Sequence, residues 1–230
     1  MNSIERNLEE VKQRIEKCCN ENNIKREDII LIAVTKTRTL EEINQVIQAG
    51  IMDIGENKVQ EIICKKDSLI SSRIHMIGHL QTNKVKSIID KVALIHSVDS
   101  IKLAEEIDKR AGAIGKTMDI LVQVNIAGEE SKFGIHPRDT MGFLEALSEY
   151  PHIHVKGLMM VAPFDANPEN VRPYFKGMKS LFEDMKSLKY MNITMEYLSM
   201  GMTNDYEIAI EEGSNMIRIG TAIFGARNYK

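Results

Sequence analysis

The chain has 230 residues, of which 43% are hydrophobic and 27% charged, and its formal net charge at pH 7 is −3. This ordinary globular composition, without a basic surplus, argues against nucleic acid or an anionic membrane as a partner. No stretch has the apolar length of a membrane span, and the N-terminal stretch lacks the apolar core of a secretion signal. Its 3 cysteines show no metal-site spacing, so we expect a cytoplasmic protein.

The first predicted element is a helix, followed by short strands in alternation with further helices. Apolar residues recur at helical spacing near the N-terminus, which predicts an amphipathic helix: Ile4, Leu8, Val11, Ile15, Cys18 and Cys19. Short apolar runs then predict eight strands: 29–34, 51–55, 74–78, 93–98, 119–125, 154–161, 194–200 and 216–220.

The segments between these strands carry helix signals. Thr39 and Glu42 have the spacing of a capping box, and Gly50 is placed to end that helix. Pro137 and Pro168 stand where a first helical turn begins. Strands alternating with helices predict βαβ units and a parallel sheet, and eight units favour a closed (β/α)₈ barrel. An open doubly wound sheet is the rival, but no Gly-x-Gly-x-x-Gly follows the first strand. We predict a single domain, 1–230.

A barrel should carry its functional residues at the C-terminal ends of the strands. Lys36 follows the first strand, and the fourth adds only 96–100, which we interpret as a helix cap. Polar or glycine-rich loops follow the other strands at 55–61, 78–84, 125–134, 162–168, 199–205 and 220–228.

Lys36 is the first candidate for chemistry. By strand alternation it shares a face with Ile30, Ile32 and Val34. If that face points into the barrel, an apolar setting lowers the pKa of the amine and makes it a nucleophile suited to a Schiff base. The alternative is a lysine at a strand end that reaches solvent.

The loops after strands seven and eight are candidates for an anion site. Ser199 and Gly201 follow strand seven, and Gly220 and Thr221 follow strand eight, where a short helix can begin. Hydroxyls and backbone N–H groups at such a place bind phosphate in many barrels. The alternative is turn and cap chemistry, with a helix that starts over 204–207.

Arg218 shares a strand face with Met216 and Gly220, so it is predicted to point into the barrel. A buried arginine needs a partner. That partner is either a carboxylate, such as Glu196, or a ligand that accepts from the guanidinium. A reactive lysine, a phosphate cradle and an interior arginine together match pyridoxal 5′-phosphate (PLP), with its aldehyde, phosphate and pyridine nitrogen.

At this point the sequence resembles the YggS/PROSC family of pyridoxal phosphate homeostasis proteins. The similar stretches, in order, are AVTKT, IGENKVQE, HMIGHLQTNK, HSVDS, VNIAGEESKFG, GLMMVAP and LSMGMTNDYEIAIEEGSNMIRIGTAIFG. They run from about residue 30 to residue 226. The resemblance implies a single (β/α)₈ barrel with a preceding helix, similar to the barrel domain of alanine racemase.

The resemblance also implies roles for individual residues. Lys36 would hold PLP as a Schiff base, and Asn57 would lie near that linkage. Ser199, Gly220 and Thr221 would bind the phosphate, while Arg218 would face the pyridine nitrogen. The remaining neighbours that it suggests are His79, Met200, Gly201 and Thr203.

An arginine opposite the pyridine nitrogen favours a carrier over an enzyme. Arginine keeps its proton, so the ring nitrogen stays unprotonated and stabilises carbanions poorly. We expect a PLP carrier or buffer in vitamin B6 homeostasis, a monomer, with PLP-dependent apo-enzymes as recipients. We also expect no second domain of the kind that completes alanine racemase.

Two enzymatic readings stay open. A single-domain PLP-dependent racemase would need a ring-face acid, for which Cys64, His79 and Tyr206 are the candidates. A cofactor-free Schiff-base aldolase acting on a phosphorylated sugar would use the same lysine and phosphate cradle.

Overall fold

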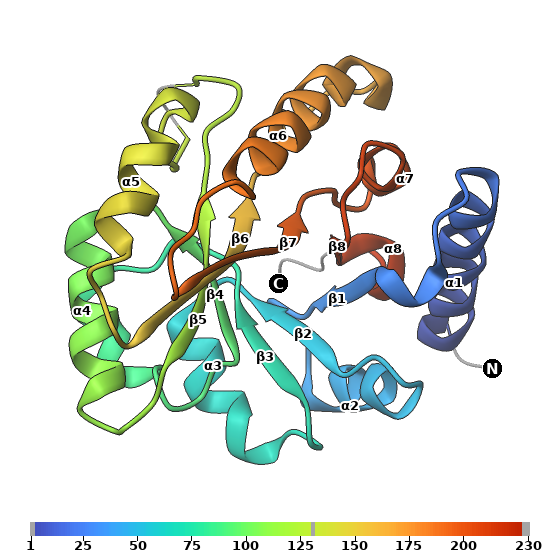
Figure 1. Ribbon diagram of the computed structural model, residues 1–230. Helices are drawn as coiled ribbons and strands as arrows, with labels where there is room; N and C mark the ends of the chain where they lie inside the picture. Colours follow the sequence, from blue (N-terminus) through green and yellow to red (C-terminus); the bar gives the residue numbers. More distant parts are fainter. Residues whose placement is uncertain (1–2, 130–131, 227–230) are drawn as a thin grey trace.

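A computed structural model of the protein describes residues 3–129 and 132–226, and its eight strands form one closed parallel barrel in the order β1 to β8 (Figure 1). The prediction of a (β/α)₈ barrel is confirmed, and each strand lies within two residues of its predicted bounds. Residues 130–131, 227 and 228 of the predicted loops lie outside the described residues. The strands are β1 (Ile30–Val34), β2 (Asp53–Glu56), β3 (Arg73–Met76), β4 (Leu94–Val98), β5 (Met118–Gln123), β6 (Ile153–Met159), β7 (Ile193–Ser199) and β8 (Met216–Ile219).

Strand β1 closes the barrel, because it pairs with β2 on one side and β8 on the other. Ala33 pairs with Ile54 of β2 and with Ile219 of β8. The seam between β7 and β8 is short, and its register pair is Ser199 with Met216. This pairing brings the C-terminal ends of strands distant in sequence to one end of the barrel.

Helices follow most strands and cover the outside of the barrel (Figure 1). The connection from β3 to β4 differs, since its helical segment Thr82–Ser87 is a 3₁₀ helix. The α-helices are α1 (Ser3–Glu21), α2 (Leu40–Gln48), α3 (Val59–Lys65), α4 (Ile101–Gly112), α5 (Thr140–Leu147), α6 (Arg172–Met185), α7 (Tyr206–Glu211) and α8 (Thr221–Phe224).

The predicted helix signals are found in place. Thr39 and Glu42 form a reciprocal capping box at the start of α2. Gly50, with φ of 92°, follows the end of α2, where a residue with a side chain would be strained. Pro137 and Pro168 begin the 3₁₀ turns Pro137–Asp139 and Pro168–Val171, which lead into α5 and α6.

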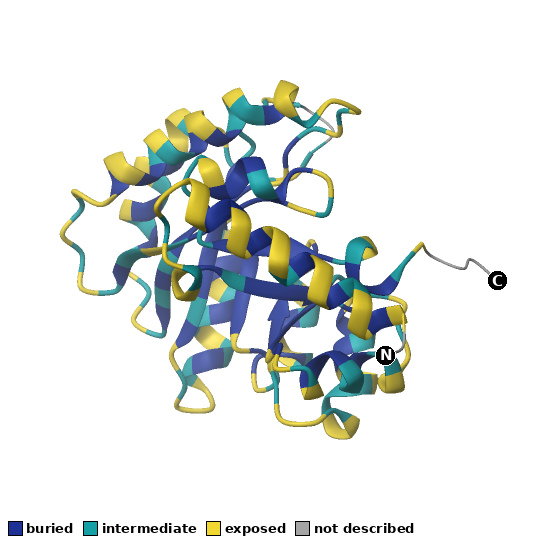
Figure 2. Cartoon of the chain, turned by 90° about the vertical axis from the view of Figure 1, so that its right-hand side faces the viewer, coloured by how far each residue is buried: buried dark blue, intermediate teal, exposed yellow. Residues whose placement is uncertain are grey.

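Buried apolar side chains form a shell between strands and helices, and a smaller group fills the barrel itself. In Figure 2 the barrel strands are coloured mostly as buried, while the helices carry both buried and exposed residues. Helix α1 buries its predicted apolar face against the outer side of β1 and β8, where it meets Ile217 and Ile219. The group inside the barrel consists of Ile32, Leu94, Leu121, Met159 and Met216. Within the described ranges, none of the helices has both the length and the apolar character needed to cross a membrane.

Candidate functional site

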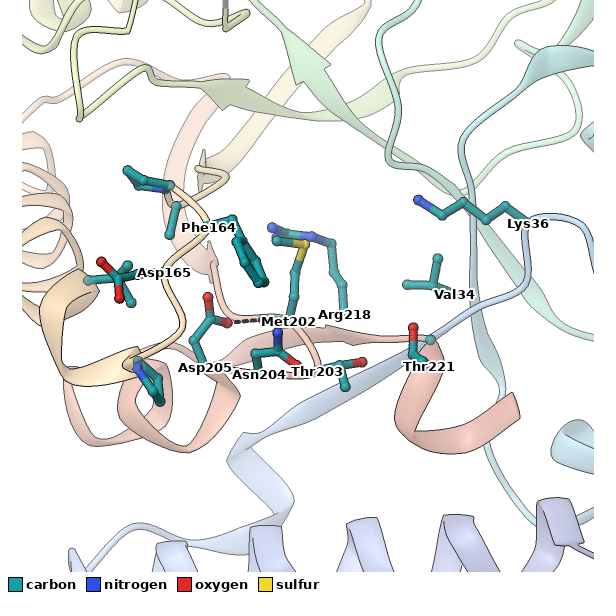
Figure 3. Close-up of a pocket in the computed structure, with 15 residues that line it drawn as sticks. Val34, Lys36, Phe164, Asp165, Met202, Thr203, Asn204, Asp205, Arg218 and Thr221 are labelled. Carbon is teal, nitrogen blue, oxygen red and sulfur yellow. Dashed lines mark hydrogen bonds between the residues drawn. The ribbon is translucent and has the colours of Figure 1, made fainter. Parts of the chain in front are cut away.

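A cavity of about 390 Å³ opens at the C-terminal end of the barrel (Figure 3). Its walls come from the ends of β1 and β8 and from the loops after β6 and β7. Figure 3 shows the side chains of Lys36, Arg218 and Thr221 bordering the same space. The lining residues are Val34, Lys36, Ala162, Pro163, Phe164, Asp165, Pro168, Val171, Met202, Thr203, Asn204, Asp205, Arg218, Gly220 and Thr221.

Lys36 lies two residues beyond β1 on the inward face that alternation predicts. Ile32, on the same face, belongs to the apolar group inside the barrel. Lys36 is half-buried, and its side chain extends into the cavity (Figure 3). The strand therefore carries the amine from the apolar interior to the cavity wall.

The backbone on both sides of Lys36 is anchored by charged groups outside the barrel. The Thr35 hydroxyl donates to Glu56 Oε1 at 2.6 Å, and Lys65 Nζ donates to the Thr35 carbonyl at 2.9 Å. The Thr37 N–H donates to Glu61 Oε2 at 2.7 Å. Thr37 has φ of 65°, an uncommon conformation for a β-branched residue. These bonds fix the direction in which Lys36 leaves its strand.

Lys65 joins the two carboxylates of this anchor. Its Nζ lies 2.7 Å from Glu56 Oε1 and 2.7 Å from Glu61 Oε2. Burial raises the pKa of Glu56, against the hydrogen bonds from Lys65 and Thr35. Burial would also raise the pKa of Glu61, but hydrogen bonds from Lys65 and Thr37 lower it below its usual range. This cluster could not be predicted from strand periodicity, since its members lie on β2 and α3.

Arg218 points into the barrel, as predicted, and is 4% exposed. Its Nη2 donates to the Met160 carbonyl at 2.8 Å, and its Nη1 donates to Ser199 Oγ at 2.5 Å. Burial lowers the pKa of Arg218 to about 10, while the charge of Asp205 opposes that shift. The guanidinium is thus a buried cation at the cavity wall.

The suggestion that Glu196 pairs with Arg218 is wrong. Glu196 is exposed and pairs with Lys156 at 2.9 Å. Strand alternation explains the difference, because Glu196 and Ser199 are three positions apart on β7 and therefore face opposite sides. Asp205, which the sequence reading did not select, is the carboxylate whose charge acts on Arg218.

Gly220 and Thr221 lie where β8 passes into the short helix α8, and both line the cavity. A Cβ atom on Gly220 would approach the Cβ of Val34 to 3.3 Å, so glycine keeps this corner open. The Ala222 N–H donates to Thr203 Oγ1 at 3.4 Å, which ties the β7 loop to α8. The helix start expected over 204–207 is also present, because α7 begins at Tyr206, with Asp205 rather than Asn204 at its N-cap.

Ser199 and Asn57 are not among the residues that line the cavity. Ser199 is fully buried behind Arg218. Asn57 follows β2, and its Oδ1 is buried with no hydrogen-bond partner in the described part of the chain. A Cβ atom on Gly78 would clash with the Asn57 carbonyl at 2.3 Å, so Gly78 permits close packing there. Direct contact of Ser199 or Asn57 with a ligand stays a prediction.

Of the other suggested residues, Thr203 lines the cavity, whereas Gly201 and the residues described next do not. His79 stacks on Phe133 with ring centroids 3.8 Å apart. Met200 belongs to the core outside the barrel. Tyr206 is buried in the cluster beneath α1, and Cys64 is exposed on α3.

The closed parallel barrel, with a lysine beyond β1 and an inward arginine on β8, places the chain in the class of alanine racemase-like barrels. Residues 1–228 match the family model described as "Alanine racemase, N-terminal domain". An alanine racemase from Clostridium difficile shares this fold at 15% identity, with a TM-score of 0.74, over 99% of this chain and 58% of that chain.

The more similar relatives narrow the family further. A "Pyridoxal phosphate homeostasis protein" of Aquifex aeolicus is 42% identical over 231 residues, covering 100% of both chains. The structure of PipY from Synechococcus elongatus "with PLP bound" is 30% identical, with a TM-score of 0.79, over 92% of this chain and 100% of that chain. The chain therefore belongs to the family of pyridoxal phosphate homeostasis proteins.

Proposed function

We propose that this protein binds PLP reversibly at the barrel cavity and serves as a carrier or buffer in PLP homeostasis. The observation that carries the proposal is a lysine amine and a buried arginine on the wall of one cavity, next to the β8–α8 corner. The family membership supports it, as does the PLP bound to the similar PipY structure.

The residues of the cavity fit the three functional groups of PLP. When bound, PLP supplies an aldehyde that condenses with an amine, and Lys36 would hold it there as a Schiff base. Gly220 leaves room at the start of α8 for a phosphate, and the Thr221 hydroxyl borders the same corner. The bonds of Arg218 to Ser199 and Met160 do not exhaust its five N–H donors, so it can also donate to the pyridine nitrogen.

Two predicted residues would act from behind the cavity wall. Ser199 would support Arg218 at this site, consistent with the hydrogen bond between them. Asn57, with its unpaired Oδ1, has an acceptor to offer if the loop after β2 moves toward Lys36.

The cavity favours binding over racemisation. A racemase needs an acid at the second face of the ring, and Tyr206, His79 and Cys64 do not line the cavity. Arg218 would also keep the pyridine nitrogen unprotonated, which disfavours carbanion chemistry. We further propose a single-domain, cytoplasmic monomer that delivers PLP to apo-enzymes.

The test is a titration of cofactor-free protein with PLP, followed by near-visible absorbance. We expect a new band that saturates at one equivalent per chain. Lys36→Ala should abolish the band, while the matched control Lys58→Ala, an exposed lysine, should leave it unchanged. A wild-type protein whose spectrum is the sum of free PLP and protein would overturn the binding proposal. Efficient conversion of L-alanine to D-alanine would overturn the carrier role.

A further inference from the structure

A chain of hydrogen-bonded polar side chains crosses the inside of the barrel. Barrel interiors are filled mainly by branched apolar side chains. Here Asp53, His75, His96 and Ser199 occupy inward positions on four different strands, and all four are buried. The inward position of His96 was not predicted, because we interpreted the segment at 96–100 as a helix cap. His96 is instead completely buried within β4.

The chain begins at the N-terminal end of the barrel. Asp53, the first residue of β2, accepts from Arg73 Nε at 2.6 Å and lies 2.9 Å from His75 Nε2. His75 Nδ1 lies 3.0 Å from His96 Nε2. The exposed side chain of Arg73 thus connects to the middle of the barrel through three short contacts.

The chain ends at the cavity. His96 Nδ1 lies 3.1 Å from Ser199 Oγ, and Ser199 Oγ accepts from Arg218 Nη1 at 2.5 Å. Arg218 lines the cavity. An uninterrupted path therefore runs from an ion pair at one end of the barrel to the proposed ligand site at the other.

With neutral histidines between them, the chemistry of the two ends sets the direction of every hydrogen bond. An ionised carboxylate only accepts, and a guanidinium only donates. Hydrogen bonds from Arg73 and His75 outweigh burial and hold the pKa of Asp53 at about 2, so it is ionised at neutral pH. His75 then donates through Nε2, and as a neutral ring it accepts at Nδ1 from His96 Nε2. Burial holds the pKa of His96 well below its usual range, so it is neutral.

These directions determine which hydrogen bonds Ser199 donates and accepts. His96, as the Nε2–H tautomer, presents a lone pair on Nδ1, and the Ser199 hydroxyl donates its one proton there. The oxygen of Ser199 then directs a lone pair at Arg218. In the opposite order, His75 would turn a lone pair toward the Asp53 carboxylate, and the serine proton would have no acceptor in the chain.

We propose that His96 is a positioning residue: through Ser199 it holds the guanidinium of Arg218 at the cavity wall, with its direction set by His75 and Asp53. This proposal rests on the proposed function, because the ligand that Arg218 faces is the pyridine ring of PLP. It predicts that Ser199 serves the ligand site through Arg218.

Two substitutions separate the two contacts of His96. In His96→Asn the side-chain oxygen occupies the place of Nδ1, so the bond from Ser199 is kept and the bond to His75 is lost. In His96→Gln the amide reaches the place of Nε2, so the bond to His75 is kept and the bond from Ser199 is lost. We expect His96→Gln to weaken PLP binding by about tenfold and to shift the absorbance band of bound PLP. His96→Asn should stay within about threefold of wild type.

The tautomers give a readout that needs no cofactor. In protein with ¹⁵N-labelled histidine, NMR should show His75 and His96 as neutral Nε2–H tautomers at pH 7. An Nδ1–H tautomer or a charged ring at either position would overturn the proposal, and so would equal PLP binding by the two His96 variants. If wild type binds no PLP, the proposed function fails, and the NMR result still decides the direction of the chain. Near-native circular dichroism would verify that both variants fold.

Discussion

At the scale of single residues, the site depends on charged groups that are held inside or against the barrel. Arg218 is buried, and within the part of the chain that the structure describes it has no direct carboxylate partner; neutral oxygens accept from it instead. Burying a charge is costly unless hydrogen bonds compensate. The polar chain behind Arg218 supplies such compensation and ends on the ionised Asp53.

Asp53 gives a prediction for pH dependence. Its pKa is lowered from 3.8 to about 2 by Arg73 and His75. A carboxyl group whose pKa is lower in the folded than in the unfolded chain stabilises the fold at pH values above its unfolded pKa. That stabilisation is lost as pH falls from about 4 toward 2. Asp53→Asn should therefore reduce the free energy of unfolding by about 2 kcal/mol at pH 7. The difference from wild type should shrink below pH 4.

Urea denaturation at a series of pH values measures this effect. The exposed Asp139→Asn serves as the control and should change the free energy of unfolding little at any pH. If the Asp53 variant differs from wild type by the same amount at pH 7 and pH 2.5, the carboxylate is not the source of the stabilisation.

At the scale of elements, β1, β2 and α3 cooperate to place Lys36. Lys65 on α3 connects Glu56 of β2 to Glu61 and to the backbone beside Lys36. Lys65→Met should destabilise the fold by about 3 kcal/mol, because it leaves two carboxylates close together without their shared cation. It should also weaken PLP binding, since Thr35 and Thr37 lose their fixed positions.

Chemical denaturation and the PLP titration together test this arrangement. Lys58→Met, seven positions earlier and exposed, is the matched control. A Lys65→Met protein with lower stability but unchanged PLP affinity would show that the cluster supports the fold alone.

The features of the site that could be predicted from the sequence are those that strand periodicity determines. It placed Lys36 and Arg218 on inward faces and put Gly220 and Thr221 at the same end of the barrel, because period-two alternation and parallel order suffice for that. It did not predict the cluster around Lys65, since those contacts join residues through the packing of α3 on β2. It also missed His96, because serine and aspartate after it resemble a cap; Ser100 does cap α4.

Ser199 shows a different limit of sequence reasoning. Its inward direction follows from alternation, but the residues that line the cavity depend on side-chain length. Arg218 fills the space between Ser199 and the cavity, so the serine lies behind the wall. Strand periodicity predicts on which side of the sheet a side chain lies, but not whether it reaches the cavity surface.

At the scale of the whole molecule, the barrel keeps a rigid interior and an accessible cavity at one end. Phe164 lies on the cavity wall and is 83% exposed, so the rim is open to solvent. Helix α1 adds a second apolar cluster behind β1 and β8, the two strands that carry Lys36 and Arg218. A cavity that is open to solvent, on strands that are packed from behind, suits a protein that takes up and releases its ligand.

PLP attachment to Lys36 can be tested by reducing the protein–PLP complex with borohydride and mapping the modified peptide by mass spectrometry. We expect one pyridoxyl group per chain, on Lys36, and none in Lys36→Ala. Modification that persists in Lys36→Ala, or that is spread over exposed lysines such as Lys58, would show that Lys36 is not the residue that holds PLP.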